Sequence, residues 1–225
     1  MSANSTHVVN AINRVAHLAA LAIDRCRGLD FLTKVESAQV GLDPSRAFRS
    51  SPSGDRYLRH VLNNLQIKTG DRILDVGCGK GSAMRCMLRF PFSQVDGIEL
   101  SSTTAAIAEK NFARLGSQRT HIFAGDAIDF PDYGNYEFIY FYNPFPSFVM
   151  AAVMRSIAAS VMNQKEITLI YNNPTCHDVV AHAGFQRLHT FPDRWGNGIA
   201  VYSSRPPETA TCLGRNAPIM RTKGR

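Results

Sequence analysis

Cysteine is scarce in this sequence and long apolar runs are missing, and both shortages exclude classes of protein. The five cysteines among 225 residues include no C-x-x-C pair, which argues against a zinc ribbon and a disulfide framework. No apolar run approaches the roughly 20 residues that span a bilayer, and the polar start makes a secretory signal unexpected. We therefore expect a cytoplasmic protein with a globular core, no membrane span and no metal site.

The positive charge of the chain, +7 at neutral pH, lies mostly at its ends. Residues 1–52 contain six basic and four acidic side chains, residues 53–204 contain fourteen and thirteen, and residues 205–225 contain five and one. Phosphate neutralisation needs clustered Lys and Arg, so the nearly neutral middle argues against a nucleic-acid surface. The basic, Pro-rich end is predicted to be a disordered tail.

These differences divide the chain into an N-terminal helical extension (1–52), a central domain (53–204) and the tail (205–225). Apolar residues of the extension recur at steps of three and four, which predicts one face of a helix. They are Val8, Val9, Ile12, Val15, Ala16, Ala19 and Ile23. We expect this helix to pack on the central domain or on a second copy of the chain, and the second arrangement would give a homodimer.

Strand-like and helix-like segments alternate in the central domain, which predicts an α/β fold. Strands are expected at 72–76, 94–100, 120–124, 136–142, 167–171, 186–191 and 199–203, and helices at 57–65, 82–90, 103–115, 148–162 and 176–183. Helical crossovers between strands imply a doubly wound, mostly parallel sheet. The last two strands are expected to form an antiparallel hairpin at one edge.

Three glycines follow the first predicted strand, in the segment Leu74-Asp75-Val76-Gly77-Cys78-Gly79-Lys80-Gly81. Glycine lets the backbone turn sharply and lie against a ligand, and ligands of open α/β sheets bind outside the carboxyl ends of strands. The spacing is G-x-G-x-G, not the G-x-G-x-x-G of dinucleotide sites, and no G-K-[ST] follows for a nucleoside triphosphate. Taken alone, this segment is a weak signal, and a plain strand-to-helix turn is the less favoured alternative.

Acidic residues also stand at the ends of the next two predicted strands. Glu99 can accept hydrogen bonds from both hydroxyls of a ribose, and Asp126 can meet the exocyclic amine of adenine. Separately, the first could be a solvent-facing acid and the second an Asx turn. Together with Asp75 and the glycine segment, they fit an adenosine that has a charged arm without phosphate.

With these residues, the chain resembles the class I S-adenosylmethionine-dependent methyltransferases over about 55–204. The matching segments, in the family's order, are L-D-V-G-C-G-K-G (74–81), G-I-E-L (97–100), A-G-D-A (124–127) and F-Y-N-P-F-P (141–146). The resemblance implies a Rossmann-like methyltransferase fold with a seven-stranded sheet and an antiparallel last strand. It also implies S-adenosyl-L-methionine as the cofactor.

The resemblance further implies roles for individual residues. Asp75 and the backbone near Gly77 and Gly79 would hold the methionine part, and Glu99 would bind the ribose. Leu100 would pack against adenine, Asp126 and Ala127 would meet its edge, and Asn143 would lie nearest the reactive methyl. The complete expected cofactor set is Asp75, Gly77, Cys78, Gly79, Gly81, Glu99, Leu100, Asp126, Ala127 and Asn143.

The segment Asn143-Pro144-Phe145-Pro146 is similar to the N-P-P-[YF] motif of enzymes that methylate amino nitrogens of bases or glutamine, but its aromatic residue is third instead of fourth. It is also reminiscent of the N-N-F element of Dot1-class lysine methyltransferases. A rigid turn beside the cofactor is the alternative. Asn143 and His177, which could accept a proton near neutral pH, are the candidate catalytic residues.

The sequence therefore predicts a methyltransferase that acts on nitrogen or oxygen of a protein or small molecule. A nucleic-acid base as acceptor and a catalytically silent cofactor-binding partner subunit are the alternatives. Arg46, Arg49 and Tyr57 are candidates for acceptor selection, and Trp195 could cover the acceptor or cap the core.

Overall fold

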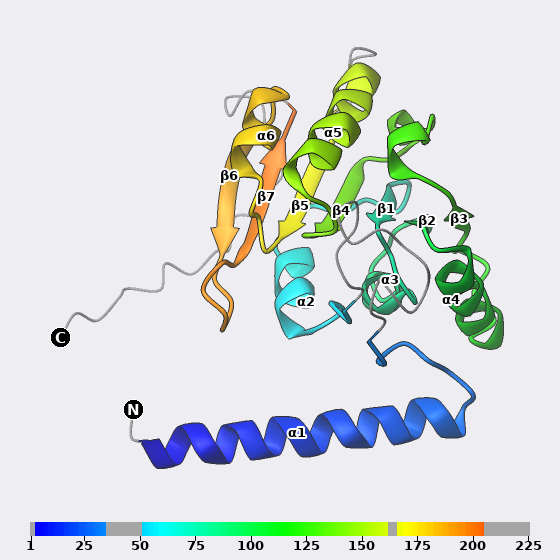
Figure 1. Cartoon of the computed structure of the whole chain (residues 1–225), viewed down its shortest axis with the longest axis vertical. Coiled ribbons are helices and arrows are strands. Elements are labelled where there is room, and N and C mark those ends of the chain that lie inside the picture. The colour runs from blue at the N-terminus through cyan, green and yellow to red at the C-terminus, as the bar shows by residue number, and fades with distance from the viewer. Residues whose placement is uncertain (1–2, 35–50, 162–165, 205–225) are drawn as a thin grey trace.

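A seven-stranded sheet forms the centre of the computed structural model, which describes residues 3–34, 51–161 and 166–204 (Figure 1). The spatial order is β3-β2-β1-β4-β5-β7-β6. The strands are β1 (Arg72–Val76), β2 (Gln94–Glu99), β3 (Ile122–Ala124), β4 (Phe138–Tyr142), β5 (Thr168–Asn172), β6 (Gln186–Phe191) and β7 (Ile199–Ser203). Strands β1 to β5 pair in parallel, whereas β7 is antiparallel to β5 and to β6. The predicted mostly parallel sheet with an antiparallel last strand is confirmed.

Helices cover both faces of the sheet, and side-chain caps fix where two of them begin. Asp55 accepts hydrogen bonds from two backbone N–H groups at the start of α2, and Ser101 accepts one from Thr104 in α4. The helices are α1 (Ala3–Cys26), α2 (Arg56–Asn63), α3 (Ser82–Met87), α4 (Ser102–Arg114), α5 (Ser147–Val161) and α6 (His177–His182), with the short 3₁₀ turns η2 (Ala127–Asp129) and η3 (Tyr133–Asn135).

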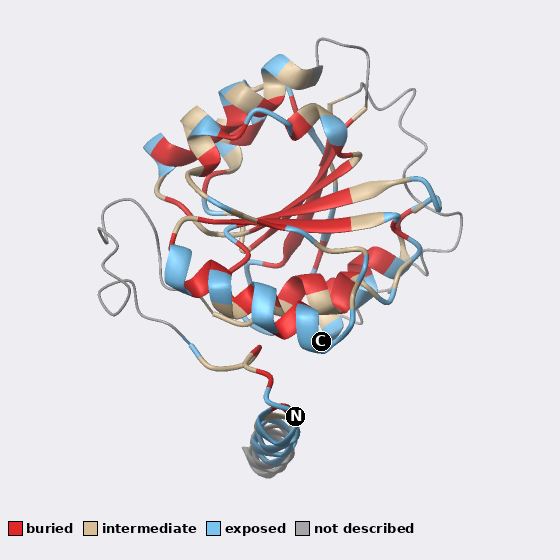
Figure 2. Ribbon diagram, turned by 90° about the vertical axis from the view of Figure 1, so that its right-hand side faces the viewer, coloured by how far each residue is buried: buried red, intermediate tan, exposed pale blue. Residues whose placement is uncertain are grey.

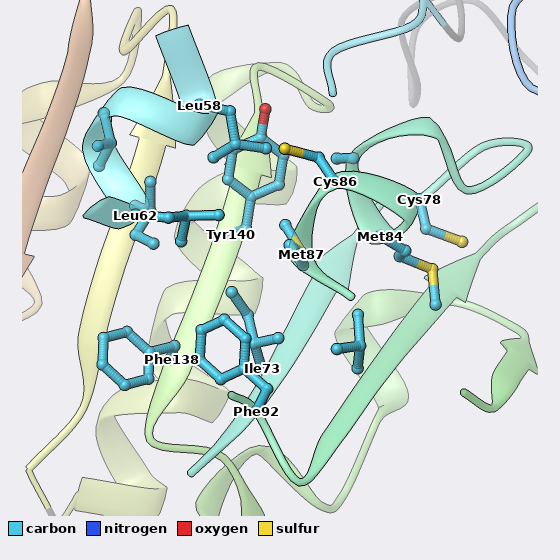
Figure 3. Close-up of a cluster of buried hydrophobic side chains, with 14 of the residues drawn as sticks. Leu58, Leu62, Ile73, Cys78, Met84, Cys86, Met87, Phe92, Phe138 and Tyr140 are labelled. Atoms are coloured by element: carbon cyan, nitrogen blue, oxygen red, sulfur yellow. The ribbon is translucent and has the colours of Figure 1, made fainter. Parts of the chain in front are cut away.

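The central strands are buried on both faces, as expected of a parallel sheet covered by helices (Figure 2). Alternation along β1 directs Ile73 to a cluster under α2, α3 and α4, and Leu74 to a second cluster under α5 and α6. In the first cluster, the rings of Phe92 and Phe138 lie 5.4 Å apart (Figure 3). The sheet is therefore a rigid platform whose strand ends hold side chains in fixed positions.

The fourth strand begins two residues later than the sequence predicts. Tyr136, expected in the strand, instead follows η3 and donates a hydrogen bond to the buried carboxylate of Asp96 at 2.8 Å. The same carboxylate accepts from the backbone N–H of His121 at 2.8 Å. This tertiary hydrogen bonding outweighs the strand preference of an aromatic residue.

Helix α1 extends away from the layers around the sheet (Figures 1 and 2). Val15 and Ile23 of the predicted apolar face are 66% and 50% exposed, so these two residues do not pack on the central domain. Leu18, which is not part of the predicted face, is 56% exposed. None of the helices in the described ranges combines the length and apolarity needed to cross a membrane. The predicted tail, residues 205–225, lies outside the described residues, as do Arg46 and Arg49.

Candidate functional site

The glycine segment between β1 and α3 adopts a conformation that requires glycine. Gly77, Gly79 and Gly81 have φ angles of 79°, 55° and 87°, in the left-handed region that L side chains rarely adopt. A Cβ at position 77 would lie 2.8 Å from the Cβ of Pro144, and one at 81 would lie 2.5 Å from the ring of Phe112. The backbone is therefore a tight turn with close neighbours on both sides.

This turn is attached to the end of β2. The backbone N–H groups of Gly77 and Cys78 both donate to the carbonyl of Ile98 at 2.9 Å. The Glu99 carboxylate accepts from the N–H of Gly79 at 2.9 Å with one oxygen and from the N–H of Ser101 at 3.0 Å with the other. The structure thus brings Glu99 directly against the glycine turn.

Asp75 and Glu99 are two buried acidic side chains whose charges affect each other. Burial, and then the charge of Glu99, raise the pKa of Asp75 to about 8. Burial also raises the pKa of Glu99, although the N–H groups of Ser101, Gly79 and Leu100 oppose this. Burial and these two carboxylates raise the pKa of the Cys78 thiol well above its usual value. A cationic ligand would relieve the cost of ionising both acids.

The third predicted acid lies beyond the end of the neighbouring strand. Glu99 of β2 is in register with Ala124 of β3, so Asp126 emerges at the same edge of the sheet. Its carboxylate accepts from the N–H of Ile128 at 2.9 Å and thereby caps η2. Ala127 is buried, and Leu100 is half-buried. The predicted adenine-side residues therefore share the edge where Asp75 and Glu99 stand.

Asn143 occupies the turn after β4 in a left-handed conformation, with φ of 39°. Its side-chain oxygen accepts a hydrogen bond from the Thr175 hydroxyl at 2.6 Å, which joins the ends of β4 and β5. The neighbouring ring of Phe145 is buried in the cluster beside α5. This aromatic ring belongs to the core, where it cannot stack on an acceptor.

His177, at the start of α6, lies against the sheet face. Its Nδ1 atom is 3.1 Å from the Tyr202 hydroxyl, and the two rings are stacked with centroids 5.7 Å apart. Tyr202 belongs to β7 and is fully buried. The structure therefore directs His177 toward β7 and does not join it to the Asp75 and Glu99 pair.

Two further polar side chains at this edge, Tyr140 and Asn172, are outside the expected cofactor set. Tyr140 is in register with Asp75, and its hydroxyl accepts from the Asn172 side-chain amide at 3.1 Å. Burial, and then the charge of Asp75, raise the pKa of Tyr140 well above its usual value. The pairing of β4 with β1 and with β5 is what brings these groups together.

The segment after α1 attaches to the glycine turn, a contact that no motif or spacing predicted. Lys80 Nζ donates to Asp30 Oδ2 at 2.5 Å and also to the Thr33 hydroxyl. Asn111 of α4 donates to the carbonyls of Asp30 at 3.0 Å and of Lys80 at 3.1 Å. Phe31 packs edge-on against Phe112, with centroids 5.4 Å apart. We call residues 29–33 the anchor segment.

Tyr57 and Trp195, two residues that could contact the acceptor, are in contact with each other. Tyr57 of α2 lies against Trp195 of the β6–β7 turn, with ring centroids 5.7 Å apart. Arg56 and Arg194 lie over these rings at 4.8 Å and 4.5 Å. Trp195 is 57% exposed, so it covers no core and is open to a ligand.

In the described ranges, no group of three or more His, Cys, Asp and Glu side chains is placed to hold a metal ion. The predicted absence of a metal from the whole chain stays a prediction.

Comparison with known proteins agrees with this geometry. The model of the mycolic acid cyclopropane synthetase family matches residues 54–139. The O-methyltransferase cnsE of Penicillium expansum is 33% identical over 90 residues, which cover 40% of this chain and 33% of that protein. Over these residues the chain is similar to S-adenosylmethionine-dependent methyltransferases.

The ribosomal RNA small subunit methyltransferase H of Crocosphaera subtropica is also similar to this chain. It is 32% identical over 74 residues, which cover 32% of this chain and 24% of that protein. The matched parts of the chain thus span only a quarter to a third of the length of these curated relatives.

Solved structures show the same fold. Mitomycin 7-O-methyltransferase MmcR has a TM-score of 0.54 at 15% identity, over 67% of this chain and 53% of that chain. Geranyl diphosphate methyltransferase has a TM-score of 0.52 at 13% identity, over 65% of this chain and 75% of that chain.

Proposed function

We propose that the carboxyl ends of β1, β2 and β3 bind S-adenosyl-L-methionine, and that the protein transfers its methyl group to a nitrogen or oxygen acceptor. The observation that supports this most is the convergence of the glycine turn with Asp75 and Glu99. An acidic, buried edge suits a ligand that has an ammonium and a sulfonium group. The match to a family model and the similarity to an O-methyltransferase support the same cofactor.

Each residue of the expected set has a distinct task in this proposal. The Glu99 oxygens each accept one backbone hydrogen bond, and a carboxylate oxygen can accept a second, so both remain available to the ribose hydroxyls. Asp75 faces the cationic methionine part. Leu100, Asp126 and Ala127 border adenine. Cys78 and Gly81 shape the turn, and neither residue offers a charged side chain to the cofactor.

The bound cofactor supplies an electrophilic methyl group, so the chain's main contribution is to position an acceptor in line with it. In this proposal Asn143 positions the acceptor; its hydrogen bond from Thr175 after β4 supports this role. The Nδ1 atom of His177 is engaged by Tyr202, so Nε2 is the nitrogen that would accept a proton from the acceptor. We therefore propose Asn143 as the principal acceptor-side residue and His177 as a secondary one.

We favour a protein or small-molecule acceptor because the central domain is nearly neutral. A nucleic-acid base is the second candidate, supported by the ribosomal RNA methyltransferase among the relatives. A cofactor-binding subunit without catalysis is the third. Incubation of the purified chain with methyl-labelled cofactor and fractionated cell extract separates them: label enters protein or small molecules, enters nucleic acid, or enters nothing.

We also propose a homodimer through α1 and a cytoplasmic location. The exposed side chains of Val15, Leu18 and Ile23 give α1 an apolar face, and a second copy would offer the same face in a two-fold arrangement. The described cysteines, Cys26, Cys78, Cys86 and Cys176, are all free thiols, as a reducing compartment would leave them.

A further inference from the structure

A cavity of about 270 Å³ lies between α1, α2 and α3, and arginine dominates its lining. Arg56 and Arg59 come from α2, and Arg85 and Arg89 come from α3 and the turn that follows it. The lining carboxylate is Asp55. None of these residues belongs to the cofactor set proposed above.

The two acidic side chains near the cavity are already engaged. Asp24 holds Arg85 through hydrogen bonds of 2.8 Å and 3.0 Å to its two oxygens. Asp55 accepts from the N–H groups of Tyr57 at 2.9 Å and Leu58 at 3.1 Å, as the cap of α2. The guanidinium groups of Arg59 and Arg89 form no hydrogen bond or ion pair with another residue in the ranges that the structure describes.

The guanidinium groups of Arg59 and Arg89 both influence the thiol of Cys86. The Cys86 side chain lines the cavity and is 7% exposed. Burial raises the pKa of its thiol, while the positive charges of Arg89 and Arg59 act against that increase. Charges from two different parts of the cavity wall therefore reach the same buried atom.

Positive charges lie close together in the wall of this cavity. Arg85 and Arg89 are four residues apart and Arg56 and Arg59 are three apart, and of these four side chains Arg85 forms an ion pair with Asp24. Arg56 also stands in the first turn of α2, where the helix dipole favours negative charge. A bound anion would remove both conflicts.

We propose that this cavity binds the phosphoryl group of a small molecule through Arg59 and Arg89, with Arg56 beside them. A phosphoryl group suits the site because its several oxygens can meet more than one guanidinium fork at once, whereas a carboxylate would neutralise a single one. Phe31, Leu32 and Ala20 form an apolar part of the wall, which suits the organic part of a small ligand.

The site is independent of methyl transfer but adjoins the cofactor turn. Ser82 lines the cavity and follows Gly81 directly in the chain. Gly54, also in the lining, approaches Ser82 so closely that a Cβ on it would overlap the Ser82 carbonyl oxygen. The ligand would therefore sit against the start of α3, outside the edge formed by Asp75 and Glu99.

Isothermal titration of the full chain with inorganic pyrophosphate tests this site. We expect saturable binding that the double variant Arg59→Gln/Arg89→Gln weakens by about tenfold or more, because it removes two charge-assisted contacts. Arg155→Gln, which removes an exposed arginine of α5, is the matched control and should bind as the unmodified chain does. Equal pyrophosphate binding by the double variant and the unmodified chain would overturn the proposal.

Two further measurements distinguish a lost contact from a damaged fold and from a different ligand. In low salt and without pyrophosphate, the double variant should melt at the same temperature as the unmodified chain or at a higher one, because like charges have been removed. A lower melting temperature together with lost binding would indicate damage to the fold and would overturn the assignment. A short single-stranded RNA that binds more tightly than pyrophosphate through the same arginines would overturn the small-molecule ligand. None of these measurements uses the methyl-donor cofactor, so they can fail without affecting the proposed methyl transfer.

Discussion

Asp75 and Glu99 are acidic residues whose side chains are almost fully buried, with exposed fractions of 3% and 8%. Such burial is costly for charged groups unless they are paired or bind a cation. Glu99 is compensated by two backbone N–H groups. Asp75 has the strongly raised pKa instead. These individual side chains thus arrange the edge for a positively charged ligand.

Glu99→Ala should weaken binding of S-adenosylhomocysteine by about 2–4 kcal/mol, or about 30- to 800-fold, because two charge-assisted hydrogen bonds to the ribose are lost. Isothermal titration measures this directly. Glu109→Ala, which removes an exposed glutamate of α4, is the control and should leave affinity unchanged. Unchanged affinity in Glu99→Ala would refute its assignment to the ribose.

Asp75→Asn should stabilise the cofactor-free protein in a pH-dependent way. The pKa of Asp75 is about 8 in the folded chain against 3.8 for an ordinary aspartate, so folded protein binds this proton more tightly than unfolded protein. The unmodified chain therefore loses stability as the pH rises from about 4 to 8, and the amide variant does not. Thermal melts should show a difference that grows over this window and then stays level. A difference independent of pH would contradict the buried, uncompensated carboxylate.

At the scale of the elements, the anchor segment links helix α1 to the glycine turn between β1 and α3. Lys80 is 8% exposed, and its ammonium group is held by Asp30 and Thr33. Asn111 adds hydrogen bonds from α4 to both sides of this contact. The turn is therefore braced by residues far from it in sequence.

Asp30→Asn should lower the melting temperature and weaken S-adenosylhomocysteine binding, because the partner charge of the buried Lys80 is lost. Asp30 is partly exposed, with a side chain 39% accessible, so we expect a loss of about 1–2 kcal/mol of stability, less than for a fully buried pair. Differential scanning calorimetry and titration measure the two effects. Asp129→Asn, on the surface beyond β3, should change neither. If Asp30→Asn behaves as the unmodified chain does, the anchor segment does not support the turn.

Local patterns predicted the elements well, and long-range contacts explain the exceptions. The strand at 72–76 begins and ends as expected, because its buried apolar residues Ile73, Leu74 and Val76 are followed directly by the glycines of the turn. Tyr136 was expected in a strand but is held outside it by Asp96. The pairing of Lys80 with Asp30 spans 50 residues, and no periodicity or spacing in the sequence indicates such a contact.

In the candidate site, too, some features could be predicted from the sequence and others depend on tertiary packing. The positions of Asp75, Glu99 and Asp126 follow from strand order, since parallel strands end at one edge. The direction in which the His177 side chain points does not follow from strand order, because its contact with Tyr202 depends on the packing of α6 over β7. The hydrogen bond between Tyr140 and Asn172 likewise depends on which strands become neighbours.

At the scale of the whole molecule, helix α1 exposes apolar side chains that no other described element covers. Val15, Leu18 and Ile23 remain exposed while Asp24, in the same helix, is buried against Arg85. The helix is therefore attached at its end and leaves an apolar face open, which is typical of an interface.

Val15→Glu/Leu18→Glu should convert a dimer into a monomer, because two charges would be placed in the apolar contact between copies. Sedimentation equilibrium measures the mass. His17→Glu, a neighbouring exposed position on a different side of the helix, should leave the dimer intact. A monomeric unmodified chain at all concentrations would contradict the proposed dimer.

A crystal structure of the chain with S-adenosylhomocysteine would test the proposed cofactor site without any intermediate step. We predict that the ribose hydroxyls contact Glu99, that the amino-acid part lies along the turn at 77–81 near Asp75, and that adenine lies beside Asp126. A ligand bound at any other place, with these three carboxylates facing solvent or one another, would contradict the proposed site.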